Sequence, residues 1–117
     1  MIGMKRVYDE RTDADGLRIL VDRLWPRGLS KPAADLDDWY RDVAPSTELR
    51  KWYGHVADQF PEFRRRYLAE LDEPARAELV ETLRGLTRDH DLMLLTATRE
   101  IELSHLVVLA EVLRAAS

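Results

Sequence analysis

The feature that most constrains the fold is a short, continuous apolar segment, Leu92-Met93-Leu94-Leu95, which has polar residues on both sides. A run that is continuous rather than alternating is typical of a strand buried on both faces, as in parallel sheets covered by helices. Helical patterns precede and follow the segment in the chain. We therefore expect a central strand that runs parallel to at least one neighbour.

Two further strands are predicted near the start of the chain, over residues 4–8 and 17–21. The second is almost entirely apolar and again suggests a buried strand. The connection between them, residues 9–16, is shorter than the dozen or more residues that a parallel crossover needs. These two strands are thus either antiparallel neighbours or not paired with each other.

Helices are predicted wherever apolar residues recur three and four positions apart. We expect them over about residues 35–43, 46–54, 60–71, 74–86 and 100–115. Asp35 and Ser46 have the side chains of N-caps, and Gly54 suits the residue after a helix end. The acidic residues around Asp35 are explained by helix capping, and they lack the spacing of a metal-binding loop.

These elements predict a single small α/β domain over residues 1–117, with a mixed, mostly parallel sheet of three to four strands packed with about five helices. The chain has no cysteine, which excludes disulfides and thiolate chemistry. No apolar run approaches the ~18 residues of a membrane span, and no secretory signal is apparent, so we expect a cytoplasmic protein with no membrane partner. The sequence indicates no cofactor, no metal site and no oligomeric state.

The charge of the chain argues against broad nucleic-acid binding, since its net charge is −4 at pH 7. Of the 18 basic residues, 15 are arginine, and this bias weakens any single arginine as a functional signal. The run Arg64-Arg65-Arg66 is interpreted as a solvated helix face or, alternatively, as a small patch for nucleic acid or another partner.

The loop after the second strand is the first candidate for a binding site, because ligands of open α/β sheets bind at the carboxyl ends of the strands. Arg23 and Arg27 lie in this loop, with Trp25 as a possible stacking wall. Such a combination suits a phosphate or carboxylate. The alternative is structural: Arg23 pairs with Asp22 or an acidic helix end, and Trp25 belongs to the core.

The turn after the 92–95 strand is the second candidate. It holds Thr98 and Arg99, where a helix beginning near residue 100 would offer free N–H groups to an anion. Thr98 could equally serve as a cap without any ligand. His55, which follows Gly54, is a further candidate for the same anion site, with a weaker claim.

His105 is the candidate catalytic residue. On a helix that starts near residue 100 it shares an inward stripe with Ile101, Val108 and Val112, close to the sheet end that carries Thr98. The alternative is a histidine whose hydrogen bonds are satisfied inside the core. In the functional interpretation it would act as a general acid or base.

Several of these segments resemble a known family. They are Lys5-Arg6-Val7-Tyr8-Asp9, Leu20-Val21-Asp22-Arg23-Leu24-Trp25-Pro26-Arg27-Gly28, residues 44–55 and Ser104-His105-Leu106-Val107-Val108-Leu109. The chain resembles the YeaO-like proteins of the domain-of-unknown-function 488 family over nearly its whole length. The resemblance implies a compact bacterial α/β protein with no assigned activity. Members often carry His where Leu103 stands, so a working histidine pair would be half missing here.

Three functions follow, from different classes. The first is a binder of an anionic, phosphorylated or nucleotide-like small molecule, which could be a hydrolase or transferase that uses His105; whether the chain is an enzyme stays open. The second is a non-catalytic protein-interaction module that presents Trp39, Trp52 or Tyr53 on an exposed helix face. The third and least favoured is a nucleic-acid-binding regulator that uses Arg64, Arg65 and Arg66.

Overall fold

A computed structural model of the chain describes residues 1–115, which form a four-stranded sheet in the order β1-β4-β2-β3. The strands are β1 (Ile2–Arg6), β2 (Leu17–Leu20), β3 (Asp38–Trp39) and β4 (Leu92–Thr96). The predicted α/β class is confirmed, and so is the central strand, because β4 pairs with β1 on one side and β2 on the other. All pairs in residues 1–115 run parallel, whereas a mixed sheet was expected.

The first two strands are not paired with each other, which was one of the two predicted alternatives. The chain reaches the start of β2 through Gly16, whose φ is 66°. A Cβ at this position would lie 2.2 Å from the carbonyl oxygen of Asp91, so only glycine fits this close approach of two backbone segments. Leu17 then donates its N–H to the same oxygen at 2.9 Å, which starts the pairing of β2 with β4.

The helix predicted over residues 35–43 is wrong. A short helix, α1 (Lys31–Ala34), ends at Asp35, whose left-handed φ of 49° makes it a C-cap rather than an N-cap. The chain then forms β3 and a 3₁₀ turn, Arg41–Val43. The apolar residues that suggested a helix pack into two different clusters, Leu36 and Trp39 in one and Tyr40 and Val43 in the other. Pairing of β3 with β2 thus overrides the local pattern.

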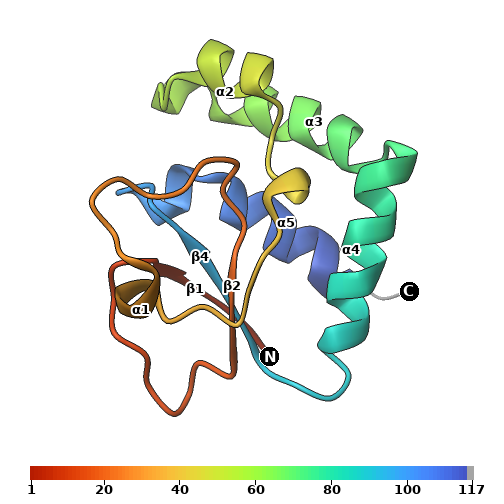
Figure 1. Cartoon of the computed structure of the whole chain (residues 1–117). Helices are drawn as coiled ribbons and strands as arrows, with labels where there is room; N and C mark the ends of the chain where they lie inside the picture. Colours follow the sequence, from red (N-terminus) through yellow and green to blue (C-terminus); the bar gives the residue numbers. More distant parts are fainter. Residues whose placement is uncertain (116–117) are drawn as a thin grey trace.

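The remaining helices are α2 (Thr47–Tyr53), α3 (Phe60–Leu71), α4 (Pro74–Leu86) and α5 (His105–Arg114). Ser46 caps α2 through its Oγ, and Gly54 ends it with a φ of 52°, as predicted. In Figure 1, α4 and α5 lie on one side of the sheet and α1 on the other. None of the helices in the described part of the chain is both long and apolar enough to cross a membrane.

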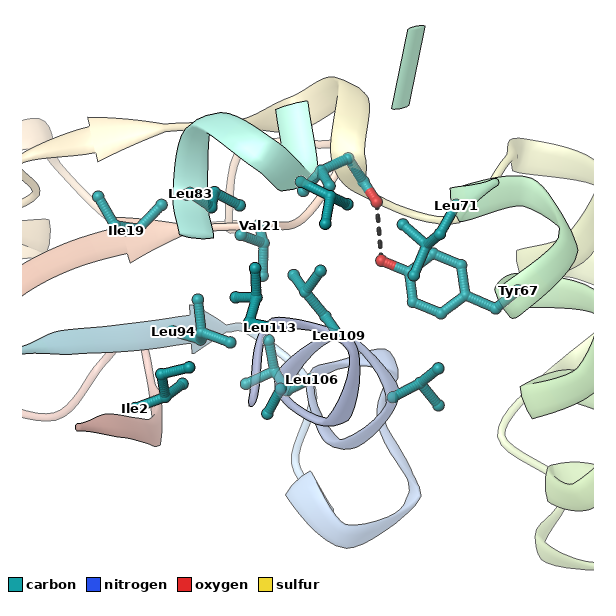
Figure 2. Close-up of a cluster of buried hydrophobic side chains, with 14 of the residues drawn as sticks. Ile2, Ile19, Val21, Tyr67, Leu71, Leu83, Leu94, Leu106, Leu109 and Leu113 are labelled. Carbon is teal, nitrogen blue, oxygen red and sulfur yellow. Dashed lines mark hydrogen bonds between the residues drawn. The ribbon is translucent and has the colours of Figure 1, made fainter. Parts of the chain in front are cut away.

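The main core lies between the sheet and the helices, as Figure 2 shows. Leu94 points from the sheet toward α5, and Ile19 lies beside Leu83 of α4; all three side chains are almost fully buried. The hydroxyl of the buried Tyr67 donates to the carbonyl oxygen of Val43 at 2.7 Å. This bond ties α3 to the turn after β3, which leads into Ala44 and Pro45 of the site described below.

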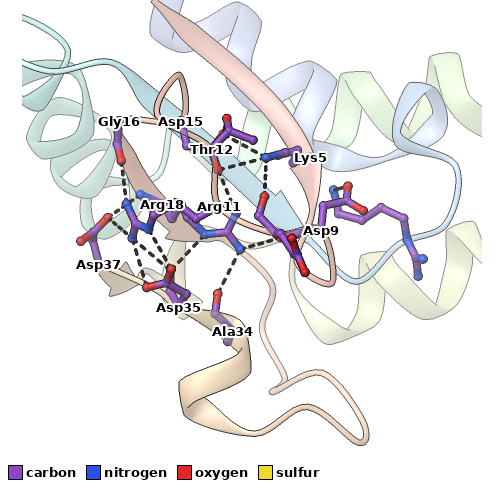
Figure 3. A network of polar contacts seen from close by, with 12 residues as sticks. Lys5, Asp9, Arg11, Thr12, Asp15, Gly16, Arg18, Ala34, Asp35 and Asp37 are labelled. Carbon is purple, nitrogen blue, oxygen red and sulfur yellow. Dashed lines mark hydrogen bonds and ion pairs between the residues drawn. The ribbon is translucent and has the colours of Figure 1, made fainter.

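The other face of the sheet carries a polar network around the buried Asp15 and Arg18; it is shown in Figure 3 and called here the buried polar network, and it also includes Lys5 and Thr12. The Arg18 side chain is 0% exposed. Its guanidinium donates to the Asp15 carboxylate at 2.9 Å and to the carbonyl oxygens of Asp9, Ala34 and Asp35. Lys5 and Thr12 also donate to Asp15. Burial raises the pKa of Asp15, but these hydrogen bonds outweigh burial and hold it well below its usual range.

The last helix begins later than expected. Residues Ile101–Leu103 form a separate 3₁₀ turn, and Ser104 caps α5 by accepting the N–H of Leu106. His105 is therefore the first residue of α5 and does not share a continuous helical stripe with Ile101. This position brings its side chain to the carboxyl edge of the sheet.

Candidate functional site

A cavity of about 360 Å³ lies beyond the carboxyl ends of β2 and β4, where open α/β sheets bind ligands. The loop after β2 forms one wall. The turn after β4, the chain before α2, the end of α2 and the start of α5 complete the cavity. Its lining residues are Asp22, Arg23, Leu24, Trp25, Pro26, Arg27, Ala44, Pro45, Arg50, Tyr53, His55, Phe63, Ala97, Thr98, Ser104 and His105.

Most of the residues singled out in the sequence lie around this one cavity, namely Arg23, Trp25, Arg27, His55, Thr98 and His105. Arg99 does not line it. Arg99 lies instead at an adjoining cavity of about 200 Å³, which also contacts His55 and Thr98. Sequence reasoning missed Arg50, because the packing of α2 over the carboxyl edge is a tertiary feature with no local signature.

Asp22 is an anion that the protein itself supplies to this edge of the sheet. Its carboxylate accepts the hydroxyl of Thr96 at 2.7 Å and the N–H of Ala97 at 2.8 Å. The next amide, that of Thr98, donates to the Thr96 hydroxyl. The amides of Ala97 and Thr98 are thus already used, and the helix expected to start at this turn is absent, so these two N–H groups are not free for an anion.

Arg23 and Trp25 shape the loop after β2. The Arg23 guanidinium donates to the carbonyl oxygens of Ala44 and Pro45, both at 3.2 Å. It does not pair with Asp22 but lies 3.7 Å from the carboxylate of Asp42, in the 3₁₀ turn after β3. The indole N–H of Trp25 donates to the carbonyl oxygen of Leu29 at 2.7 Å. These bonds fasten both ends of the loop, so that it forms a fixed wall of the cavity.

Arg27 and Arg50 differ from Arg23 in having exposed guanidinium groups with no partner. Neither side chain makes a hydrogen bond or an ion pair to any residue in the 1–115 range. One comes from the loop after β2 and the other from α2, so they approach the cavity from two separate elements. Two unpaired cations beside one cavity create a positive potential at its opening.

His105 lies deeper, with 11% of its side chain exposed. Its Nε2 is 2.9 Å from the carbonyl oxygen of Val21 and 3.4 Å from Oδ1 of Asp22. Burial lowers the pKa of the imidazole, although Asp22 and the Val21 carbonyl oppose the shift. The ring is therefore neutral at pH 7.

His55 reaches the opening of the cavity through an unusual backbone. Gly54 and His55 are both left-handed, with φ values of 52° and 59°. For a residue other than glycine this conformation is uncommon and carries strain. The reversal places the imidazole against the Tyr53 ring, with 5.6 Å between centroids, where it contacts both cavities.

The residues proposed for a protein or nucleic-acid surface have other contacts. Tyr53 is buried and donates its hydroxyl to Leu103, and the Trp52 ring is covered by the Arg66 guanidinium at 4.1 Å. Arg64 pairs with Glu111, while Arg65 and Arg66 share Glu62, whose pKa falls to about 2 through these hydrogen bonds. Within residues 1–115, no group of three histidine or acidic side chains could hold a metal ion.

Comparison with known proteins gives the family. The family model described as the inactive DUF488-N3 subclade matches residues 1–117. An uncharacterised protein of Mycobacterium tuberculosis is 45% identical over 113 residues, covering 96% of this chain and 92% of that protein. The uncharacterised protein YeaO of Escherichia coli is 44% identical over 114 residues, covering 97% and 96%. No solved structure matches significantly. The chain belongs to the domain-of-unknown-function 488 family, in the subclade described as inactive.

Proposed function

We propose that the chain is a cytoplasmic receptor for a small phosphorylated molecule, which it binds without transforming it. The observation that carries this proposal is the pair of unpaired guanidiniums, Arg27 and Arg50, at the opening of one cavity. A cavity of about 360 Å³ is at the lower end of the range for small-molecule sites. Guanidinium groups bind phosphate through two parallel hydrogen bonds, which suits an anion held between two arginines.

Binding without catalysis is favoured over a hydrolase or transferase by the state of the hydroxyl groups. The hydroxyls of Tyr53, Thr96 and Ser104 donate to Leu103, Asp22 and Ile101 respectively. The hydroxyl of Thr98 has no partner in residues 1–115 and contacts no histidine that could activate it. No pair of hydroxyl and histidine is in hydrogen-bond contact within residues 1–115, as an activated nucleophile would require. The description of the matching subclade as inactive supports the same proposal. His105 then has a role in recognition rather than as an acid or base.

The proposal is tested by titrating inorganic phosphate at low ionic strength and following the melting temperature and the heat of binding. Phosphate should raise the melting temperature because it binds only the native state. Arg27→Ala and Arg50→Ala should each weaken phosphate binding about tenfold or more, as expected for loss of a charged hydrogen bond.

Arg88→Ala is the matched control, because Arg88 is also exposed and has no side-chain partner in residues 1–115, but lies just before β4 at the opposite edge of the sheet. This variant should bind phosphate like the wild type. Equal phosphate affinity in all four proteins would show that the cavity is not the anion site.

A further inference from the structure

The cavity has a second chemical preference at its floor, which differs from that of its arginine rim. We propose that the ligand carries a hydroxyl group in addition to its phosphate, and that this hydroxyl donates to Nδ1 of His105. The ligand class is then a phosphorylated sugar or polyol. This inference rests on the proposed function, since it describes the second end of the same ligand.

The tautomer of His105 follows from the two atoms beside Nε2. Both the Val21 carbonyl oxygen, at 2.9 Å, and Oδ1 of Asp22, at 3.4 Å, can only accept a hydrogen bond. Nε2 must therefore carry the hydrogen. In a neutral imidazole the other nitrogen, Nδ1, then has a lone pair and accepts. The first two residues of the loop after β2, Val21 and Asp22, thus make Nδ1 of His105 an acceptor.

Nδ1 of His105 is free to accept a hydrogen bond. It makes no hydrogen bond to any residue in the described part of the chain. Nδ1 is also not fully buried. Among residues 1–115 only one side-chain nitrogen or oxygen is both fully buried and without a partner, and that atom is Nε of Arg84. Since His105 lines the cavity, a ligand there can meet this lone pair.

The floor and the rim of the cavity select opposite groups. An anion placed at the floor would approach the Asp22 carboxylate and the lone pair of Nδ1, and both would repel it. A hydroxyl group suits that position, while a phosphate suits Arg27 and Arg50 at the exposed rim. Trp25, Tyr53 and Phe63 contribute apolar walls between the two ends, against which the carbon atoms of a sugar can pack.

The experiment compares ribose 5-phosphate with tetrahydrofurfuryl phosphate, which has the same ring and phosphate but no hydroxyl groups. Calorimetry should show that ribose 5-phosphate binds at least about fivefold more tightly than tetrahydrofurfuryl phosphate. This factor corresponds to one hydrogen bond made in a partly buried site. In wild-type protein labelled with nitrogen-15, the signal of the unprotonated His105 nitrogen should move on adding ribose 5-phosphate and stay in place with the other ligand.

Two variants should respond in opposite ways. Arg27→Ala should weaken the binding of both phosphate esters and keep the ratio of their affinities. His105→Phe removes the acceptor and keeps a ring, so it should bring this ratio to about one.

Equal binding of the two esters to the wild type, with no shift of the nitrogen signal, would overturn the inference and leave the proposed anion site unaffected. Failure of inorganic phosphate and both esters to bind would overturn the proposed function itself.

Discussion

Two groups of charged residues in this molecule differ in how completely they are paired. The buried polar network of Lys5, Thr12, Asp15 and Arg18 lies on the α1 face of the sheet, and Arg18 alone makes four bonds to protein acceptors (Figure 3). At the cavity, the guanidiniums of Arg27 and Arg50 have no partner among residues 1–115. A buried charge has to be paired to be tolerated, so the network is explained by the fold alone. The cavity arginines are not.

The difference shows how to choose candidate binding residues in this arginine-rich chain. Whether a guanidinium already has a partner in the protein is more informative than how many arginines are present. Arg18 and Arg23 are used to fasten loops to the sheet and to the chain before α2. Removing Arg18, which lies on the other face of the sheet from the main core and does not line the cavity, should reduce stability and leave ligand binding unchanged. Removing a rim arginine should do the reverse. The predictions that follow exploit this contrast.

The largest effect is expected for Arg18→Ala. This change removes the buried guanidinium that pairs with Asp15 and the donor to the carbonyl oxygens of Asp9 and Ala34, so the free energy of unfolding should fall by about 3–5 kcal/mol. Urea denaturation followed by circular dichroism measures it. Arg11→Ala is the control, since Arg11 pairs with Asp35 and Asp37 at the surface and should cost about 1 kcal/mol or less. Equal losses in the two variants would remove the distinction between buried and exposed pairing.

Acid should break the network in a defined pH window. Because the pKa of Asp15 is lower in the folded state than its ordinary value of 3.8, the native state is stabilised at any pH above that value. This contribution is lost as the pH falls below about 4 toward the folded-state pKa. Asp15→Asn should therefore be less stable than wild type at pH 7, and the gap should narrow below pH 4. Urea midpoints of both proteins, measured from pH 7 to pH 2.5, test this expectation. A difference between the two midpoints that does not change with pH would show that the ionised Asp15 carboxylate does not contribute to stability.

Protonation of His105 should reduce stability in a different pH range. Its folded-state pKa lies below 6.5, so the unfolded chain takes up the proton first and stability falls as the pH drops below 6.5. Asp22, Arg50, His55 and Tyr67 are the titratable or charged groups around the ring. His105→Gln should flatten this slope, and His55→Gln separates the contribution of the second imidazole.

Two substitutions of His105 distinguish a side chain that faces a polar cavity from one that lies in a dry core. Glutamine can still donate to the Val21 carbonyl oxygen, so His105→Gln should cost under about 1 kcal/mol. His105→Leu leaves that oxygen unpaired and should be less stable than the glutamine variant. Denaturant midpoints in the opposite order would show that His105 seals the core.

The smallest change in stability is expected for Arg27→Ala. An exposed side chain without partners should alter the free energy of unfolding by no more than about 0.5 kcal/mol. Thermal melts without phosphate measure this value directly. A large loss would mean that Arg27 has a structural role like that of Arg18, and the contrast between the two groups would fail.

Parts of the fold could be predicted because the signal is local. The continuous run at β4 indicated a buried strand, and Ser46 and Gly54 marked the two ends of α2. The helix expected at residues 35–43 could not be rejected locally, since its apolar residues have helical spacing yet pack in two clusters. The strand order was also out of reach, because the partner of β1 lies about ninety residues away in the chain.

The site was predictable to the extent that the carboxyl ends of strands can be located. This rule alone brought the loop of Arg23, Trp25 and Arg27 together with Thr98. It could not show that Asp22 already accepts the amide of Ala97, since that depends on the exact fit of two loops. Nor could it supply Arg50, which reaches the cavity only because α2 packs over this edge.

The position of β4 in the chain also determines when the sheet can form during synthesis. It is the central strand of the sheet but the last to be made, so β1 and β2 wait without their main partner until residue 96 has been added. At the usual 5–20 residues per second this delay is on the order of 5–20 s. During that time two apolar strand edges are open to other nascent chains. Expression at low temperature or with chaperones should raise the soluble yield for this reason, even though the finished domain is small.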